Sequence, residues 1–213
     1  MKRPRVLITG FGPFPGAPVN PTEALIRRLE AEPGHLSGLC DIRTAVLPVE
    51  YAAVPDLLAD LGRRHSPDIA IHFGLSAEAE GFTLERLARN EIAAGKPDNA
   101  GGQPKSACIV DAGEGISYSL PLDEIAERLT EAGLSWSWSD DAGGYLCNYL
   151  FYLSRSPHFP ALSAPMSGFV HVPPLADEGS GANALSSNVM SLDDMVAGAR
   201  LIAEACVAAR RRA

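Results

Sequence analysis

Residues 5–9 are Arg-Val-Leu-Ile-Thr and residues 20–23 are Asn-Pro-Thr-Glu, and these two segments decide the fold. The first is a short apolar run of the kind that forms a buried strand. The second predicts the start of a helix, because Asn20 can cap it, Pro21 suits its first position and Glu23 can reach back as in a capping box. A strand followed by a helix is the unit from which α/β sheets are built.

The same alternation of apolar runs and helical patterns continues along the chain, which favours an α/β sheet with helices packed on its faces. A half-buried strand over 82–90 is indicated by alternating apolar and polar residues. The last helix begins after Ser191, which can cap it, and carries an apolar stripe as far as Cys206. The other strands are predicted at residues 42–46, 68–74, 134–139 and 168–172, and the other helices at residues 52–64, 121–132 and 145–155.

Composition and charge restrict the function classes. The chain has 213 residues, of which 46% are hydrophobic, and this predicts one globular domain over residues 1–213. Its net charge is −8, so a nucleic-acid partner is not expected, because phosphate binding needs clustered Lys and Arg. No uncharged apolar stretch approaches the roughly 18 residues of a membrane span. The apolar run at 6–11 is too short for a signal peptide, so we expect a cytoplasmic protein.

The four cysteines lie far apart, without a CxxC pair or a histidine at zinc-finger spacing, so neither structural zinc nor disulfides are expected. Cys206 lies on an apolar helix face, and Cys40 and Cys108 lack a neighbour that would ionise them, so these three are expected to be structural. Cys147 differs, because Gly143-Gly144 predicts a tight turn directly before its helix. A helix N-terminus stabilises a thiolate, which is a good nucleophile. Plain packing of Cys147 remains the alternative.

A nucleophilic thiol also needs a base, and His171 is the best-placed histidine. It lies at the C-terminal end of an apolar strand, where α/β sheets gather catalytic groups. His72 is expected to be buried and hydrogen-bonded, because its strand continues past it. His35 and His65 lie at helix ends and are expected to be solvated.

A carboxylate would have to orient the imidazole, and Glu85 is a candidate because it lies in the strand predicted at 82–90. The alternative is that Glu85 faces solvent and pairs with Arg86 or Arg89. Two aspartates, Asp140 and Asp141, are closer to the cysteine in sequence, but carboxylates just before a helix are expected to cap it.

Four motifs resemble, in their order and spacing, those of pyroglutamyl-peptidase I, the family of pyrrolidone-carboxylate cysteine peptidases. The resemblance spans nearly the whole chain and is far more specific than a lone cysteine or glycine-rich loop. The motifs are VLITGFGPF at 6–14 followed by NPT at 20–22, TLER at 83–86 around the family's glutamate, DAGGYLCN at 141–148 around its nucleophile and GFVHVP at 168–173 around its histidine, and PDN at 97–99 also fits.

The resemblance implies a three-layer α/β/α sandwich with a mostly parallel, twisted central sheet of the phosphorylase/hydrolase-like kind. It also implies a cysteine exopeptidase that removes the N-terminal pyroglutamyl residue from peptides. Cys147 would be the nucleophile, His171 its general base and acid, and Glu85 the residue that orients the imidazole. The reaction would pass through a thioester, with backbone N–H groups at the helix start binding the oxyanion. Neither a metal nor an organic cofactor is expected.

The resemblance further implies a pocket for the uncharged lactam ring of pyroglutamate. An ordinary charged N-terminus would be desolvated there without a partner, and would therefore be rejected. Without the resemblance, core packing is an equal alternative for the two phenylalanines. The pocket would consist of Phe11 and Phe14, Tyr145 and Leu146 opposite them, the backbone of Leu75 facing the lactam N–H, and Asn20, which braces the phenylalanine loop.

The chain departs from the family pattern near this site. Gly95, followed by Lys96, stands where many bacterial members have an arginine near the oxyanion, and Leu75 stands where many have glutamine. Glu78-Ala79-Glu80 adds negative charge nearby. These departures predict a weaker activity or an altered preference for the leaving peptide.

Two other function classes remain open. Gly10-Phe11-Gly12 after a strand would suit a non-catalytic small-ligand-binding α/β module, although the GxGxxG spacing is missing. A phosphorylase-like transferase on a related fold would use phosphate and no essential thiol. Apolar residues between Tyr149 and Phe159 are a candidate subunit contact for a homo-oligomer, either a dimer or a tetramer. The Gly/Ser/Asn-rich segment 176–188 is long enough to be mobile or functional.

Overall fold

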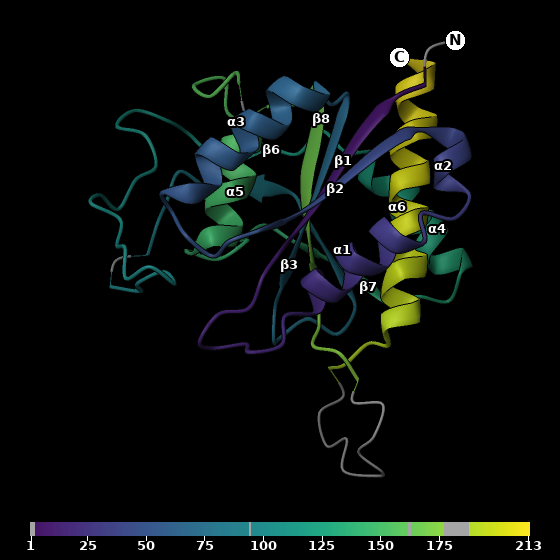
Figure 1. Cartoon of the computed structure of the whole chain (residues 1–213), viewed down its shortest axis with the longest axis horizontal. Coiled ribbons are helices and arrows are strands. Elements are labelled where there is room, and N and C mark those ends of the chain that lie inside the picture. Colours follow the sequence, from purple (N-terminus) through teal and green to yellow (C-terminus); the bar gives the residue numbers. More distant parts are fainter. Residues whose placement is uncertain (1–2, 94, 162, 177–187) are drawn as a thin grey trace.

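The computed structural model describes residues 3–93, 95–161, 163–176 and 188–213, and a six-stranded sheet forms the centre of this described part (Figure 1). Neighbouring strands are parallel except β8 and β4, which are antiparallel, so the prediction of a mostly parallel sheet is confirmed. In spatial order the strands are β2 (Asp41–Leu47), β1 (Arg5–Phe11), β3 (Ile69–Leu75), β8 (Met166–Val172), β4 (Phe82–Glu85) and β7 (Trp136–Ser139).

Helices cover both faces of the sheet, which makes the three layers that the family resemblance implies (Figure 1). Each face has its own hydrophobic core, because successive side chains of a strand point to opposite faces. In β8, for example, Val170 belongs to one core and its neighbour Phe169 to the other. One face carries α1 (Pro21–Ala31), α2 (Leu36–Leu39), α4 (Leu122–Glu131) and α6 (Leu192–Arg212), and the other carries α3 (Ala53–His65) and α5 (Leu146–Arg155).

The first strand and helix form as the sequence predicts, with one correction. Asn20 caps α1 by accepting a hydrogen bond from the Thr22 N–H at 3.1 Å, and Pro21 is the first helical residue. The reciprocal half of the capping box is absent from the described contacts, because the Glu23 carboxylate pairs with Arg27 one turn further along, at 3.4 Å. The capping-box prediction for Glu23 is therefore wrong.

The strand predicted over 82–90 is also corrected, because it breaks at Arg86. β4 pairs with β7 and β8, whereas β5 (Leu87–Ala88) leaves the sheet to pair with β6 (Ile116–Ser117). Arg86 lies between the two sheets. Its N–H donates to the Ser139 carbonyl in the six-stranded sheet, and its carbonyl accepts the N–H of Tyr118, the residue after β6. This break brings residues 86–93 towards α5.

The histidine and cysteine predictions are mixed in outcome. His72 is fully buried and its Nδ1 lies 2.7 Å from Thr9 Oγ1, as expected, and burial lowers its pKa to about 3. His65 is buried instead of solvated, because the last turn of α3 lies against β1 and the ring contacts the Val6 carbonyl at 3.3 Å. Cys108 is exposed, so its prediction as a structural residue is wrong.

Cys40 and Cys206 are buried, as predicted. Burial raises the pKa of Cys40 to about 11 and raises that of Cys206 further. His35 is exposed and pairs with Glu204. Ser191 caps α6 by accepting from the Asp194 N–H at 3.0 Å, which confirms the predicted start of the last helix.

The apolar surface predicted between Tyr149 and Phe159 is not found. Residues 150–153 are buried, because α5 packs against β3 and β8 of the sheet and also against β5 and β6. The large exposed hydrophobic residues of the described part are Val19, Trp138 and Val189. Of the segment predicted to be mobile or functional, residues 177–187 lie outside the described residues. No helix in the described part is long and apolar enough to cross a membrane.

Candidate active site

The start of α5 presents Cys147 at the second helical position. Gly143, in the left-handed region at φ +77°, makes the turn that precedes the helix, and Tyr145 is the N-cap with an extended backbone. No side chain of the described residues caps this helix, so no side chain occupies its first N–H groups. The predicted capping by Asp140 and Asp141 is therefore wrong; both carboxylates pair with arginines.

Gly74 lets the sulfur approach the sheet. A Cβ at this position would lie 2.8 Å from Cys147 Sγ and 2.7 Å from the Phe169 ring, closer than real side chains allow. Gly74 is also the register partner of His171 on β8. The missing side chain thus makes room for the thiol beside the imidazole. Sequence reasoning missed this residue, although a glycine inside an apolar strand signals a close approach.

His171 and Glu85 meet across β8 and β4. The His171 Nδ1 atom lies 2.7 Å from Glu85 Oε1, and the two residues are 6% and 1% exposed. The antiparallel pairing of Thr83 with His171 places them on neighbouring strands, on the sheet face covered by α5. The alternative of a solvent-facing Glu85 paired with Arg86 or Arg89 is wrong, because α5 covers this face and both arginines pair with aspartates instead.

The electrostatics favour a charged imidazole. Burial by itself lowers the pKa of His171, but the charge of Cys147, hydrogen bonds to Cys147 and Glu85, and the charge of Glu85 outweigh it and raise the pKa to about 10. His171 therefore contacts Cys147 on one side and Glu85 on the other. The three predicted residues are brought together from α5, β8 and β4.

A cavity of about 1160 Å³ opens beside these residues. It is larger than a single lactam ring needs, since pockets for drug-sized ligands span roughly 300–1,000 Å³. Glu78 and Glu80 lie on its wall together with Lys96. All the residues predicted for the ring pocket line this cavity with the three catalytic candidates, namely Phe11, Phe14, Asn20, Leu75, Tyr145 and Leu146 together with Cys147, His171 and Glu85.

Hydrogen bonds to backbone carbonyls hold the loop that carries the phenylalanines and the segment beside it. The Asn20 side-chain amide donates to the Gly12 carbonyl at 2.9 Å, in agreement with its predicted bracing position. Asn99 donates to the Pro13 carbonyl at 2.9 Å, and the Tyr145 hydroxyl donates to the Pro97 carbonyl at 3.0 Å. The Pro-Asp-Asn segment at 97–99 therefore joins the two walls of the cavity.

Lys96 supplies a positive charge at the cavity, next to Gly95. Its ammonium lies 4.2 Å from the centre of the Tyr145 ring and 6.0 Å from that of Phe14, within cation–π range of both. Among the described residues, no group of three or more His, Cys, Asp or Glu side chains could hold a metal ion. The chemistry that this arrangement offers is nucleophilic attack by a thiolate, with an oriented imidazole that accepts and donates protons.

Several known proteins are similar to this chain over most of its length. Residues 4–209 match the family model for pyroglutamyl peptidase. The pyrrolidone-carboxylate peptidase of Pyrococcus furiosus is 37% identical over 175 residues, 82% of this chain and 83% of the relative. The pyroglutamyl-peptidase 1 of Homo sapiens is 38% identical over 180 residues, 82% of each chain.

Solved structures show the same architecture. The pyrrolidone carboxyl peptidase of Thermococcus litoralis superposes with a TM-score of 0.83 at 30% identity, covering 98% of this chain and 96% of its own. The pyroglutamyl peptidase I of Bacillus amyloliquefaciens gives 0.82 at 29% identity, covering 98% of both chains. Because the family model spans almost the full length and relatives above 30% identity cover more than two thirds of each chain, this chain belongs to the pyroglutamyl peptidase family.

Proposed function

We propose that this protein hydrolyses the bond between an N-terminal pyroglutamyl residue and the rest of a peptide, with Cys147 as nucleophile. The observation that carries the proposal is the chain of contacts from Cys147 to His171 to Glu85 at the wall of a cavity. Cys147 is half-buried at a helix start, and His171 with its raised pKa is a proton carrier that stays charged at neutral pH.

In the acylation step, the Cys147 thiolate attacks the pyroglutamyl carbonyl carbon and the carbonyl π electrons move to its oxygen. As the tetrahedral intermediate collapses, the C–N bond breaks and the His171 imidazolium gives its proton to the leaving nitrogen. The products are a thioester on Cys147 and a free peptide amine. Neutral His171 remains, hydrogen-bonded to Glu85.

In the second step, neutral His171 takes a proton from water, whose oxygen attacks the thioester carbon. The C–S bond then breaks, which releases pyroglutamic acid and restores the thiolate and imidazolium. Each of the two steps passes through a tetrahedral intermediate that carries an oxyanion. The uncapped N–H groups at the start of α5 are the candidate hydrogen-bond donors to this oxyanion. One such donor contributes on the order of 100-fold or more to kcat in comparable sites.

The cavity accounts for selection of the lactam. Phe11, Phe14 and Tyr145 supply apolar walls that suit an uncharged ring. A free proline N-terminus has the same ring size but carries a charge that these walls would desolvate without a partner.

We expect this selection to be measurable as the ratio of two kcat/KM values. Release of nitroaniline from pyroglutamyl 4-nitroanilide should exceed release from prolyl 4-nitroanilide by at least about 1000-fold. Equal rates on both amides would contradict the lactam pocket. Phosphate-dependent turnover that survives alkylation of Cys147 would favour the phosphorylase-like alternative, and ligand protection without any turnover would favour the binding module.

Replacement of Gly74 by alanine tests the position of the sulfur. The new Cβ would meet Cys147 Sγ and the Phe169 ring, so the thiol must move away from His171. We expect kcat to fall about 100-fold, because small misplacements of reacting groups are that costly. Overpacking should also reduce the free energy of unfolding by about 1–3 kcal/mol.

The control for this variant is Gly38→Ala, since a Cβ at Gly38 would meet nothing within 4 Å. It should leave kcat and the midpoint of thermal unfolding near those of the wild type. A Gly74→Ala protein with wild-type kcat would show that the sulfur does not depend on this close approach.

The single domain over residues 1–213, the cytoplasmic location and a homo-oligomer stay predictions from the sequence. Peptides that begin with pyroglutamate are the proposed substrates. Glu78 and Glu80 also line the cavity and add negative charge to its wall.

A further inference from the structure

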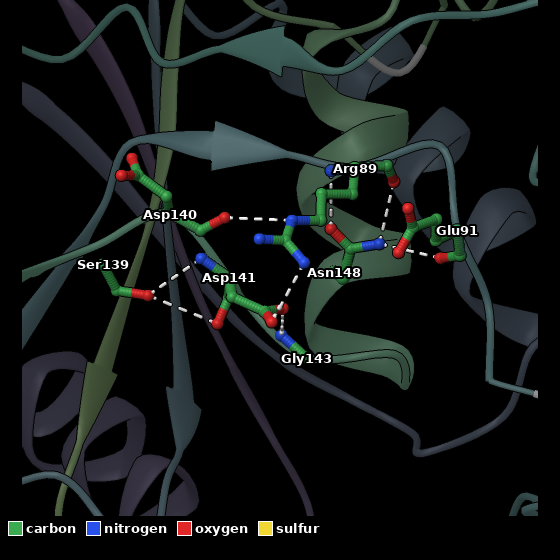
Figure 2. Close-up of polar contacts among 7 residues, drawn as sticks. All are labelled: Arg89, Glu91, Ser139, Asp140, Asp141, Gly143 and Asn148. Carbon is green, nitrogen blue, oxygen red and sulfur yellow. Dashed lines mark hydrogen bonds and ion pairs between the residues drawn. The ribbon is translucent and has the colours of Figure 1, made fainter.

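Arg89 connects the segment after β5 to the turn before Cys147 (Figure 2). Its guanidinium donates through Nε to the Asp140 carbonyl at 3.1 Å and through Nη1 to Asp141 Oδ2 at 3.0 Å. The other Asp141 oxygen, Oδ1, accepts the Gly143 N–H at 3.0 Å. The carboxylate of Asp141 therefore bridges the Arg89 guanidinium and the backbone of the turn that precedes Cys147.

The backbone of Arg89 is itself fixed to α5. Asn148, fully buried and adjacent to Cys147, accepts from the Arg89 N–H at 2.8 Å and donates to the Arg89 carbonyl at 2.8 Å (Figure 2). The same side chain donates to the Glu91 carbonyl at 2.8 Å. Arg89 is thus anchored by its backbone to the helix and reaches by its side chain to the turn that precedes this helix.

Ser139 holds the other end of this turn. Its hydroxyl accepts the Asp141 N–H at 3.0 Å and lies 3.3 Å from the Asp141 carbonyl, to which it donates (Figure 2). Beyond Gly143, the Gly144 carbonyl accepts the Ala93 N–H at 2.7 Å. The turn is therefore held at several points. Of its two ion pairs, Arg86–Asp140 and Arg89–Asp141, the second uses the carboxylate that also accepts the Gly143 N–H.

We propose that Arg89 and Asp141 are positioning residues: by holding the turn at Gly143 they set the direction of the N–H groups that follow it at the start of α5, the candidate oxyanion donors. The inference deepens the proposed function and rests on it. Gly143 has a positive φ and no side chain, so its backbone relies on outside contacts to keep one conformation. The Asp141 carboxylate supplies such a contact directly at the Gly143 N–H.

Because the Arg89–Asp141 pair is exposed, an effect on catalysis can be told apart from an effect on folding stability. The side chains of Arg89 and Asp141 are 36% and 58% exposed, and exposed ion pairs contribute little to folding. Loss of the pair should therefore move the midpoint of thermal unfolding by no more than about 4 °C. A donor shifted by a fraction of an ångström, in contrast, acts directly on the transition state.

The experiment compares Arg89→Met, Asp141→Asn and the double variant with the wild type on pyroglutamyl 4-nitroanilide, all in a Cys108→Ser background. We expect kcat to fall about tenfold in each variant, with KM within about twofold, because the contact acts on the oxyanion. The double variant should fall no further than the single ones, since the two residues act as one unit.

A second readout is the rate of Cys147 alkylation by iodoacetamide, which forms no oxyanion. The double variant has the same net charge as the wild type, so its alkylation rate should stay within about twofold while its kcat falls. Alkylation that slows in parallel with kcat would overturn the inference, because the pair would then act on the thiol and not on the donors.

Matched controls come from the neighbouring ion pair. Asp140 pairs with Arg86 between the same two segments at similar exposure, but its carboxylate has no contact with Gly143 among the described residues. Asp140→Asn and Arg86→Met should keep kcat within about twofold. If the wild type is active and the Arg89 and Asp141 variants have the same kcat as these controls, the positioning role is refuted and the proposed function stands. A wild type without turnover would refute the proposed function and the inference together.

Discussion

Cys147→Ser is expected to lower kcat on pyroglutamyl 4-nitroanilide by on the order of 10⁴-fold, the largest effect of any single change proposed for this protein. The reason is the charge state that the site favours. His171 is held as an imidazolium by the charge and hydrogen bond of Cys147 and by Glu85. A serine hydroxyl does not ionise at neutral pH, so it offers His171 no anion and remains a poor nucleophile until a base removes its proton.

The control for this variant is Cys108→Ser, because Cys108 is the exposed thiol of the described part and lies outside the cavity lining. It should keep full activity. Iodoacetamide should label Cys147 and Cys108 in the wild type, since Cys40 and Cys206 are buried with raised pKa values. A Cys147→Ser protein as fast as the wild type would remove the nucleophile assignment and leave the cavity without its proposed chemistry.

Glu85→Gln is expected to lower kcat by about 1000-fold, the second-largest effect. Glu85 Oε1 accepts a hydrogen bond from His171 Nδ1, which sets the tautomer and orientation of the ring. A glutamine can present its amide nitrogen to Nδ1 and thereby favour the wrong tautomer. Its side chain is also neutral, so the imidazolium loses a charge that supports it.

The same variant should change the pH profile in a defined direction. In the wild type the pKa of His171 is raised from 6.5 to about 10, so the imidazolium stabilises the fold fully below pH 6.5 and progressively less as pH rises to about 10. Loss of Glu85 lowers this pKa. The alkaline limb of the kcat/KM profile should therefore move to lower pH, because the proton donor for the leaving amine is lost earlier.

The measurement is kcat/KM between pH 6 and pH 10.5, with Glu127→Gln as the control because Glu127 is exposed on α4 and remote in sequence from the site. The control profile should coincide with that of the wild type. An alkaline limb that does not move in Glu85→Gln would show that Glu85 does not support the charge of His171, whatever its effect on kcat.

The predicted helix starts and the predicted turn at Gly143 were correct, because each depends on a few neighbouring residues. Asn20 and Pro21 start α1, Ser191 starts α6, and the turn at Gly143 precedes the helix with Cys147 in its first turn, as their residue types indicate. Capping and backbone preferences act over three or four residues, so the sequence contains them completely. The errors at Glu23 and Asp141 have one cause, since a nearby arginine competes for each carboxylate.

Glu85 shows the limit of such patterns. Alternation in β4 indicates that Thr83 and Glu85 share a face, and taken alone it favours solvent on that face. The structure covers it with α5, so that Glu85 is 1% exposed and faces His171. Family resemblance identified the residue, whereas periodicity could not, because coverage depends on a helix about 60 residues further along the chain.

By itself the sequence determined most of the elements and the alternation that makes an α/β sheet, and through motifs of the family it proposed a nucleophile, a base and a carboxylate. Only the tertiary structure decided that Gly74 leaves room for the sulfur, that Asp141 bridges Arg89 and the Gly143 N–H, and that Lys96 lies against two aromatic rings. The physical reason is the range of the interactions. Caps and turns join neighbours in sequence, but these contacts join segments that become neighbours only when the sheet and both helix layers have packed.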